Sequence, residues 1–226
     1  MATIAVIGTG RMGGLISRKL SGSHDLILID MNLRSCGELA KELGALGTRE
    51  YSLIDKADFI ITALSHLVMP QAVEELSKYI KPNQVVINVS TDNEMDTFEP
   101  IKDKCILAYA KIIGHAKEIG LGELPAILVG SDNDEVKQKV AGIFSRMGVV
   151  CFGDEKTVKT VNKIASEEGV KAAFLLQQRL EELNIPKEYI SFAIRNVASG
   201  VMNAYALGEA GPFVENIISK IKLNGK

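Results

Sequence analysis

A glycine-rich turn near the N-terminus constrains the fold of this chain more than any other feature of its sequence. The stretch GTGRMG at residues 8–13 directly follows the apolar run TIAVI and precedes a segment with helical spacing. A strand, a glycine turn and a helix in this order form the phosphate-binding start of a βαβ unit, where the helix N-terminus faces a pyrophosphate. The turn therefore predicts a dinucleotide-binding domain, in which the cofactor is contacted by Gly8, Thr9, Gly10, Arg11, Met12 and Gly13.

The residues after the second apolar run bear on the identity of the dinucleotide. The run DLILI at residues 25–29 is followed by Asp30. An acid at this place accepts hydrogen bonds from the ribose diol and favours NAD, whereas a nearby arginine such as Arg34 accommodates the 2′-phosphate of NADP. Asp30 therefore slightly favours NAD, and the sequence is compatible with either NAD or NADP as the cofactor. Ligands of such sheets bind at the carboxyl ends of the strands, which predicts further cofactor contacts at Ala63, Leu64 and Ser65.

Short apolar runs alternate with segments of helical period over residues 3–153. This alternation is typical of a parallel sheet that is covered by helices on both faces. The sequence therefore predicts an α/β fold with a Rossmann-type, mostly parallel, doubly wound sheet. The runs expected to form strands are 3–7, 25–29, 48–50, 58–64, 84–90, 104–110, 125–130 and 149–153.

The pattern changes to helical spacing alone after Asp154. Apolar residues predict one long helix to about Leu183, a second helix over residues 187–206 and a third that begins at Pro212. We therefore expect a Rossmann domain over residues 1–153 and a small all-α domain over residues 154–226. A helical tail of this size that is apolar on more than one face needs another surface to bury itself, which predicts a homodimer through the C-terminal helices.

Composition and charge argue against several classes of partner. The 226 residues are 46% hydrophobic with a formal net charge of −2, which gives no electrostatic reason to expect nucleic acid or an anionic membrane surface as a partner. No apolar run approaches the ~20 residues of a membrane span, and the N-terminus lacks the features of a signal peptide. The three cysteines are far apart, form no metal pattern and suit a reducing cytoplasm. These observations predict a cytoplasmic protein with a small-molecule substrate and no metal site.

Three stretches carry a resemblance to a known superfamily: IAVIGTGRMGGLISRKL, ADFIITALSHLVMPQAVEEL and QVVINVS. They resemble the N-terminal domain of pyrroline-5-carboxylate reductase, which shares its glycine turn with the β-hydroxyacid dehydrogenases of the 3-hydroxyisobutyrate and 6-phosphogluconate type. The resemblance covers residues 3–130 well and the remainder loosely. It implies a nicotinamide-dependent oxidoreductase whose substrate lies between the Rossmann domain and helices contributed partly by a second subunit.

The segment before residue 154 is similar to that of the β-hydroxyacid dehydrogenases, in which the next helix carries the motif K-x-x-N. Lys159 and Asn162 match this motif, which implies that Lys159 is the general acid/base and that Asn162 holds the substrate. A lysine can act in this way if it is partly buried or beside another cation, because both disfavour its charged form and bring its pKa toward neutrality. Substrate contacts are also expected at Lys111 and His115, after the strand 104–110, and at Ser166 in the helix.

The substrate motifs of both families are otherwise altered. The Pro-Asn-Thr-Pro and Ser-Gly-Gly loops are missing, and Ser166-Glu-Glu-Gly169-Val170 stands where a Ser-Gly-Ser-Gly-Pro motif is expected. Two hypotheses therefore stay open. The first is an NAD(P)-dependent reductase or dehydrogenase that acts on a small imine, oxo or hydroxy substrate. The second is a catalytically silent NAD(P)-binding regulatory or sensor protein on the same scaffold.

Overall fold

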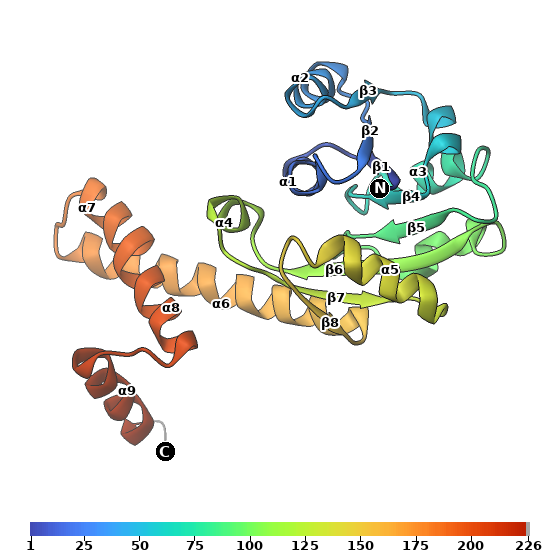
Figure 1. The fold of residues 1–226 in the computed structure, drawn as a ribbon. Helices are drawn as coiled ribbons and strands as arrows, with labels where there is room; N and C mark the ends of the chain where they lie inside the picture. Colours follow the sequence, from blue (N-terminus) through green and yellow to red (C-terminus); the bar gives the residue numbers. More distant parts are fainter. Residues whose placement is uncertain (225–226) are drawn as a thin grey trace. The chain divides into compact units, whose positions relative to one another are not determined.

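A computed structural model describes residues 1–224 of the protein and contains one eight-stranded sheet in the order β3-β2-β1-β4-β5-β6-β7-β8 (Figure 1). Neighbouring strands are parallel except β6 and β7, which are antiparallel. The chain leaves β1 in one direction and returns at β4 on its other side, which creates the switch point where ligands bind in such folds. The strands are β1 (Thr3–Ile7), β2 (Asp25–Ile29), β3 (Leu46–Thr48), β4 (Phe59–Thr62), β5 (Val85–Asn88), β6 (Ile106–Ile113), β7 (Ala126–Gly130) and β8 (Val149–Phe152).

The side chains of the central strands β1, β2, β4 and β5 alternate between two apolar layers, one on each face of the sheet. Ile4 and Val6 of β1 pack into one layer, and Ala5 and Ile7 into the other. This period of two is the expected geometry of a strand buried on both faces, and it confirms the predicted doubly wound fold. The first layer is covered by α1 (Arg11–Leu20), α2 (Leu33–Leu43), α4 (Ala116–Leu121) and α5 (Asp134–Phe144), and the second by η1 (Tyr51–Lys56), α3 (Met69–Leu76) and η2 (Met95–Ile101).

Local signals in the sequence set several helix ends. The Asn32 side chain accepts a hydrogen bond from Ser35 N and caps α2, which ends at Gly44 in the left-handed conformation with φ 64°. Asn133 caps α5 in the same way, and Pro70 lies in the first turn of α3. The short elements α4, η1 and η2 were not predicted from the sequence, because single helical turns show no apolar period.

Strand β6 is longer than the predicted strand 104–110, since it begins at Ile106 and continues to Ile113. Its partner β5 ends opposite Tyr109, whereas β7 pairs with β6 from Tyr109 to Ile113. The second half of β6 is therefore held by an antiparallel neighbour that the apolar pattern did not reveal. As a consequence, Lys111 lies within a strand and does not follow one.

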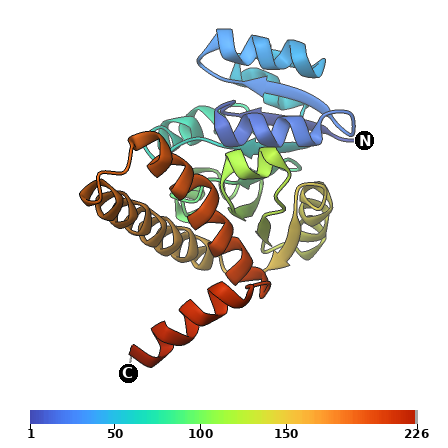
Figure 2. The same ribbon diagram turned by 90° about the vertical axis from the view of Figure 1, so that its left-hand side faces the viewer.

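The chain divides into two compact units, Met1–Asn162 and Lys163–Lys226, so the division falls within a long helix, whereas the sequence pattern changes at Asp154. This helix is α6 (Glu155–Glu182), and its first two turns belong to the first unit. In the second unit, α7 lies beside the C-terminal end of α6 (Figure 2). Residues of both helices line a common cavity. The segment predicted as one helix over 187–206 comprises α7 (Lys187–Phe192), a π-helical stretch η3 (Ala193–Ala198) and α8 (Ser199–Leu207), and α9 (Pro212–Asn224) follows.

Candidate active site

The glycine turn after β1 has the geometry that close approach of a phosphate requires. Gly8 adopts a φ of 92°, which favours glycine, and a Cβ at Gly13 would lie 1.8 Å from Gly8 O. Gly10 differs from both, because a Cβ built on it meets no atom within 4 Å. Gly8 and Gly13 are therefore required by the turn itself, whereas Gly10 leaves open space at the N-terminus of α1, where the residues fit a bound pyrophosphate.

Asp30 braces this turn. Its Oδ2 atom accepts hydrogen bonds from Thr9 N at 2.6 Å and from Thr9 Oγ1 at 3.0 Å, and its Oδ1 atom accepts one from Asn32 N at 2.9 Å. A carboxylate offers about four acceptor positions, so these bonds leave little capacity for a ribose diol. Asp30 thus fixes Thr9 and the entry to α2 in addition to any contact with a cofactor.

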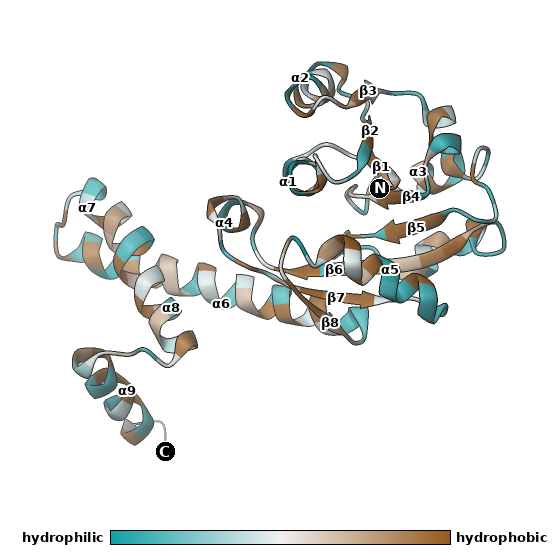
Figure 3. Ribbon diagram, in the orientation of Figure 1, coloured by the Kyte–Doolittle hydropathy of each residue, from teal (hydrophilic) through white to brown (hydrophobic). Residues whose placement is uncertain are grey.

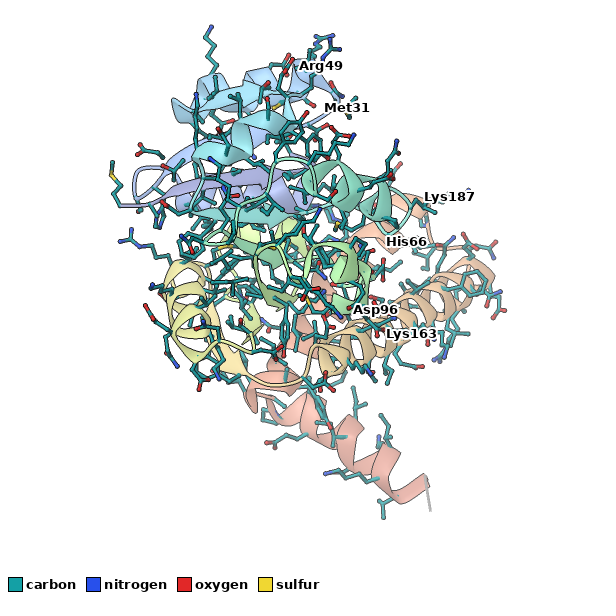
Figure 4. The ribbon with its side chains drawn as sticks, turned by 90° about the vertical axis from the view of Figure 1, so that its right-hand side faces the viewer. Met31, Arg49, His66, Asp96, Lys163 and Lys187 are labelled. Carbon is teal, nitrogen blue, oxygen red and sulfur yellow. The ribbon has the colours of Figure 1, made fainter. Side chains whose placement is uncertain are left out.

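A cavity of about 620 Å³ adjoins Asp30 at the carboxyl ends of β1 and β2. Its walls include apolar residues such as Ile7, Leu64 and Ala72, together with Tyr51 and Tyr79. Apolar walls with a few polar groups suit a flat, largely apolar ring such as adenine. Met31 and Arg49, labelled in Figure 4, also line this cavity.

The other residues predicted to contact the cofactor lie around the turn. Arg11 is the exposed first residue of α1, and half-buried Met12 packs against the apolar layer. Ala63, Leu64 and Ser65 follow β4, where Ala63 N donates to Ile7 O and Ser65 O accepts from Met69 N of α3. The Arg34 side chain is 90% exposed and pairs with Glu38 in α2. Arg49, which the sequence did not single out, is thus the arginine that the structure places at the cavity.

A polar cluster follows β5 at the same edge of the sheet. Asn88 Nδ2 donates to Asn93 O at 2.8 Å, and Asn93 Nδ2 donates to Ser90 Oγ at 2.8 Å. Asn93 Nδ2 also reaches Leu64 O at 3.4 Å. The loop between β5 and η2, residues 89–94, is therefore hydrogen-bonded directly to the segment after β4, where the sequence predicts cofactor contacts.

Lys111 lies beneath this loop with a side chain only 2% exposed. Its ammonium donates to Ser90 O and, at 2.6 Å, to Asn93 O, and lies 3.3 Å from Glu155 Oε2. Burial lowers the pKa of Lys111 to about 8, although Glu155 opposes this shift. Lys111, which was expected to contact the substrate, is thus enclosed by the protein. Its pKa is lowered toward neutrality.

Lys159 lies in the first turns of α6 and has a side chain 47% exposed. Its Nζ atom donates to Glu94 Oε1 at 2.6 Å. The hydrogen bond and charge of Glu94 raise the pKa of Lys159 above its ordinary value. The conditions that bring the pKa of a lysine toward neutrality are therefore not met at Lys159, because its hydrogen-bonded partner is an anion and water reaches its ammonium.

Three further predicted residues lie on or near α6 and β6. Asn162 Nδ2 donates to Ile112 O at 2.9 Å, which anchors α6 to the part of β6 that extends beyond β5. His115 is exposed immediately before α4, and Ser166 is exposed on α6. Asn162 is thus tied to β6, which carries Lys111, and Lys159 to the loop that Lys111 contacts. No side-chain hydrogen bond joins His115 to these three residues in the described part of the chain, and Ser166 belongs to the second unit.

Sequence reasoning missed Asn88, Asn93, Glu94 and Glu155. The first three lie in the stretch NVSTDNE, a polar run directly after a buried strand. Such a run at the carboxyl end of a strand is a signal for a site, and it could have identified this loop. Glu155 gave no signal, because its partner Lys111 is distant in the sequence.

This arrangement, with a glycine turn, a cavity beside Asp30 and a polar loop after β5, defines a dinucleotide-binding domain of Rossmann type. Residues 3–92 match the family described as NADP oxidoreductase, coenzyme F420-dependent. The match confirms the prediction of NAD or NADP as the cofactor. The chain is also 32% identical over 102 residues to a glyoxylate reductase of Pyrococcus furiosus. This aligned stretch covers 44% of this chain and 30% of the relative. The chain therefore matches less than a third of the length of this curated relative.

Two solved structures share the fold over nearly all of the chain. A pyrroline-5-carboxylate reductase from Coxiella burnetii has a TM-score of 0.73 at 14% identity, with 97% of this chain and 84% of that chain covered. The 3-hydroxyisobutyrate dehydrogenase of Mycobacterium tuberculosis has a TM-score of 0.61 at 17% identity, with 97% and 70% covered. Both groups that the sequence motifs resemble thus have this fold, and at these identities the likeness extends to the fold alone.

Proposed function

We propose that the protein is an NAD(P)-dependent oxidoreductase that transfers hydride between nicotinamide and a small imine, oxo or hydroxy substrate, with Lys159 as the general acid/base, which donates the proton in the direction of reduction. One observation carries the proposal. The loop after β5 contacts Leu64, in the segment after β4 where the sequence predicts cofactor contacts, through Asn93 and holds Lys159 through the adjacent Glu94. The proposed proton donor and this predicted cofactor segment are therefore connected by two consecutive residues.

The chemistry requires a hydride and a proton. A reduced nicotinamide, when bound, supplies the hydride to the carbon of a C=N or C=O bond. The Lys159 ammonium gives its proton to the nitrogen or oxygen of that bond, and the neutral amine regains a proton from water. Lys159, whose pKa is raised by Glu94, is protonated at neutral pH and so carries the proton that reduction requires. It is a weaker acid than a lysine whose pKa lies near the operating pH.

The direct test is the oxidation of NADH and NADPH in the presence of a panel of cyclic imines, oxo acids and aldehydes. The proposal predicts substrate-dependent loss of nicotinamide absorbance with at least one member of the panel. Tight binding of the cofactor without turnover of any of these classes would instead favour the regulatory or sensor protein.

Lys159→Ala is expected to lower kcat by about 10²- to 10⁴-fold, the usual effect of removing a positioned proton donor. Dissociation constants for NADH and NADPH should not change, because the side chain contacts Glu94 and no residue of the glycine turn. Lys156→Ala, which removes an exposed lysine from the same helix, is the matched control. Steady-state kinetics that show the same kcat for the two variants would exclude Lys159 from the reaction.

We also propose that two copies of the chain associate through the second unit. Across residues 163–223, Ile190 alone is buried, although hydrophobic residues recur along α6, α8 and α9 (Figure 3). Phe174 and Tyr205 are 57% and 63% exposed. Large hydrophobic side chains that are exposed along several helices are typical of a protein–protein interface.

A dimer is expected to sediment at twice the chain mass of 24.5 kDa. Phe174→Asp should shift the distribution toward the single chain, since a charge in an apolar interface is not paired. Lys171→Asp, which changes a neighbouring exposed charged residue, is the control. A wild-type protein that sediments as a single chain at micromolar concentration would contradict this proposal.

In the described part of the chain, no helix is long and apolar enough to cross a membrane. Cys36, Cys105 and Cys151 are free thiols. Free thiols persist in a reducing compartment, which supports the proposal of a cytoplasmic protein.

A further inference from the structure

The backbone on both sides of Glu94 is held by a buried ion pair. On one side, Asn93 O accepts a hydrogen bond from Lys111 Nζ at 2.6 Å. On the other, Met95 N donates to Glu155 Oε1 at 2.9 Å. Lys111 and Glu155 are themselves 3.3 Å apart, with side chains 2% and 11% exposed. The two charges thus enclose residues 93–95 and fix the position from which the Glu94 side chain extends.

Glu94 is the one residue of this segment whose side chain reaches α6. Its Oε1 atom accepts from Lys159 Nζ at 2.6 Å, and its side chain is 33% exposed. Glu155, the anion of the buried pair, begins the same helix that carries Lys159. The pair therefore fixes both partners of the outer contact, Glu94 through the loop and Lys159 through the first turn of α6.

We infer that Lys111 and Glu155 are positioning residues, which hold the Glu94 carboxylate against Lys159 and so fix the place of the proton donor beside the loop after β5. This inference rests on the proposed role of Lys159 and extends it by two steps. Glu94 is the immediate partner of Lys159, and the buried pair acts through the backbone on each side of Glu94.

The charged groups around Lys159 agree with this assignment. Glu94 is the largest influence on the pKa of Lys159, and Asp92 and Asp96 raise it further from the same loop and from η2. Lys156 and Lys163 are the cations nearest along α6, one turn away on either side. Conversely, Lys159 is the main cause of the lowered pKa of Glu94, ahead of Lys156 and Lys111. Removal of Glu94 would leave Lys159 with weaker anions and two neighbouring cations.

The test measures the protonation of Lys159 and needs no turnover. The rate at which acetic anhydride acetylates Lys159 is followed against pH by peptide mass spectrometry, because only the free amine reacts. Glu94→Gln is expected to shift this profile to lower pH, and Glu94→Asp to shift it less, since a shorter carboxylate keeps the charge. The alkaline limb of the kcat/KM profile should move in the same direction.

The double variant Lys111→Met/Glu155→Met tests the buried pair, because it replaces both charges with apolar groups of similar length. It is expected to shift the Lys159 profile in the direction of Glu94→Gln, although Glu94 and Lys159 are both present. A folded double variant with the wild-type profile would overturn the role of the pair. An unchanged profile in Glu94→Gln would overturn the whole inference, whether or not the double variant folds. If the acetylation profiles shift as expected but no substrate of the panel is turned over, only the proposed function is contradicted.

Discussion

Gly10→Val is expected to weaken the binding of NADH and NADPH by about 100-fold or more, about 2.7 kcal/mol, without a loss of stability. A Cβ at Gly10 meets no protein atom within 4 Å, and the residue has a φ of −64°, which valine adopts without strain. The added side chain therefore occupies only the space in which a pyrophosphate would approach the N-terminus of α1. Fluorescence titration with each cofactor and thermal unfolding measure the two effects.

Two glycines provide the controls for this substitution. Gly37→Val in α2 also adds a side chain where no atom lies within 4 Å, and it should change neither binding nor stability by a measurable amount. Gly13→Ala should destabilise the fold, because its Cβ would lie 1.8 Å from Gly8 O. If Gly10→Val bound either cofactor as tightly as the wild type, the pyrophosphate would have to lie elsewhere.

Lys111→Met is expected to lower the free energy of unfolding by about 3–5 kcal/mol, because it leaves the Glu155 carboxylate buried without a counter-charge. Lys159→Met breaks a shorter ion pair whose two side chains are 47% and 33% exposed, and pairs that water reaches contribute less than about 1 kcal/mol. Urea unfolding of both variants at equal protein concentration separates the two cases. Equal stability of the two variants would mean that Lys111 is solvated in the folded protein.

The lowered pKa of Lys111 also predicts how stability depends on pH. The folded pKa is about 8 and the ordinary value is 10.5, so the unfolded chain binds more protons between these two values. The free energy of unfolding of the wild type should therefore rise with pH in this window, relative to Lys111→Met/Glu155→Met. Below about pH 8 the contribution of this group should be constant, since Lys111 is then protonated in both states.

The strands and the cofactor turn could be predicted from the sequence because local residues determine them. The run at residues 3–7 is buried on both faces, so its apolar character is continuous, and Gly8 and Gly13 serve a turn of only six residues. Asn32, Gly44 and Pro70 likewise act within one helical turn of their own position. Each of these signals was readable without knowledge of the rest of the chain.

The candidate site could be predicted only in part, because distant partners determine the state of its charged groups. Lys159 was identified from the resemblance to the K-x-x-N motif of the β-hydroxyacid dehydrogenases, but its pKa is raised by Glu94, which lies 65 residues earlier. Lys111 was expected to follow a strand as a substrate contact, whereas pairing with β7 extends β6 past it and Glu155 pairs with its buried ammonium. No local pattern contains these contacts, so the sequence predicted where the polar residues gather but not which lysine is buried.

A crystal structure of the protein with NADP⁺ would show whether the glycine turn and Lys159 serve one bound cofactor. We expect a pyrophosphate on residues 8–13 and a nicotinamide ring beside the loop after β5. Lys159 Nζ should then reach an atom bound over the ring within about 3 Å or through one water. A nicotinamide ring that lies away from this loop, with Lys159 out of reach, would exclude Lys159 as the proton donor.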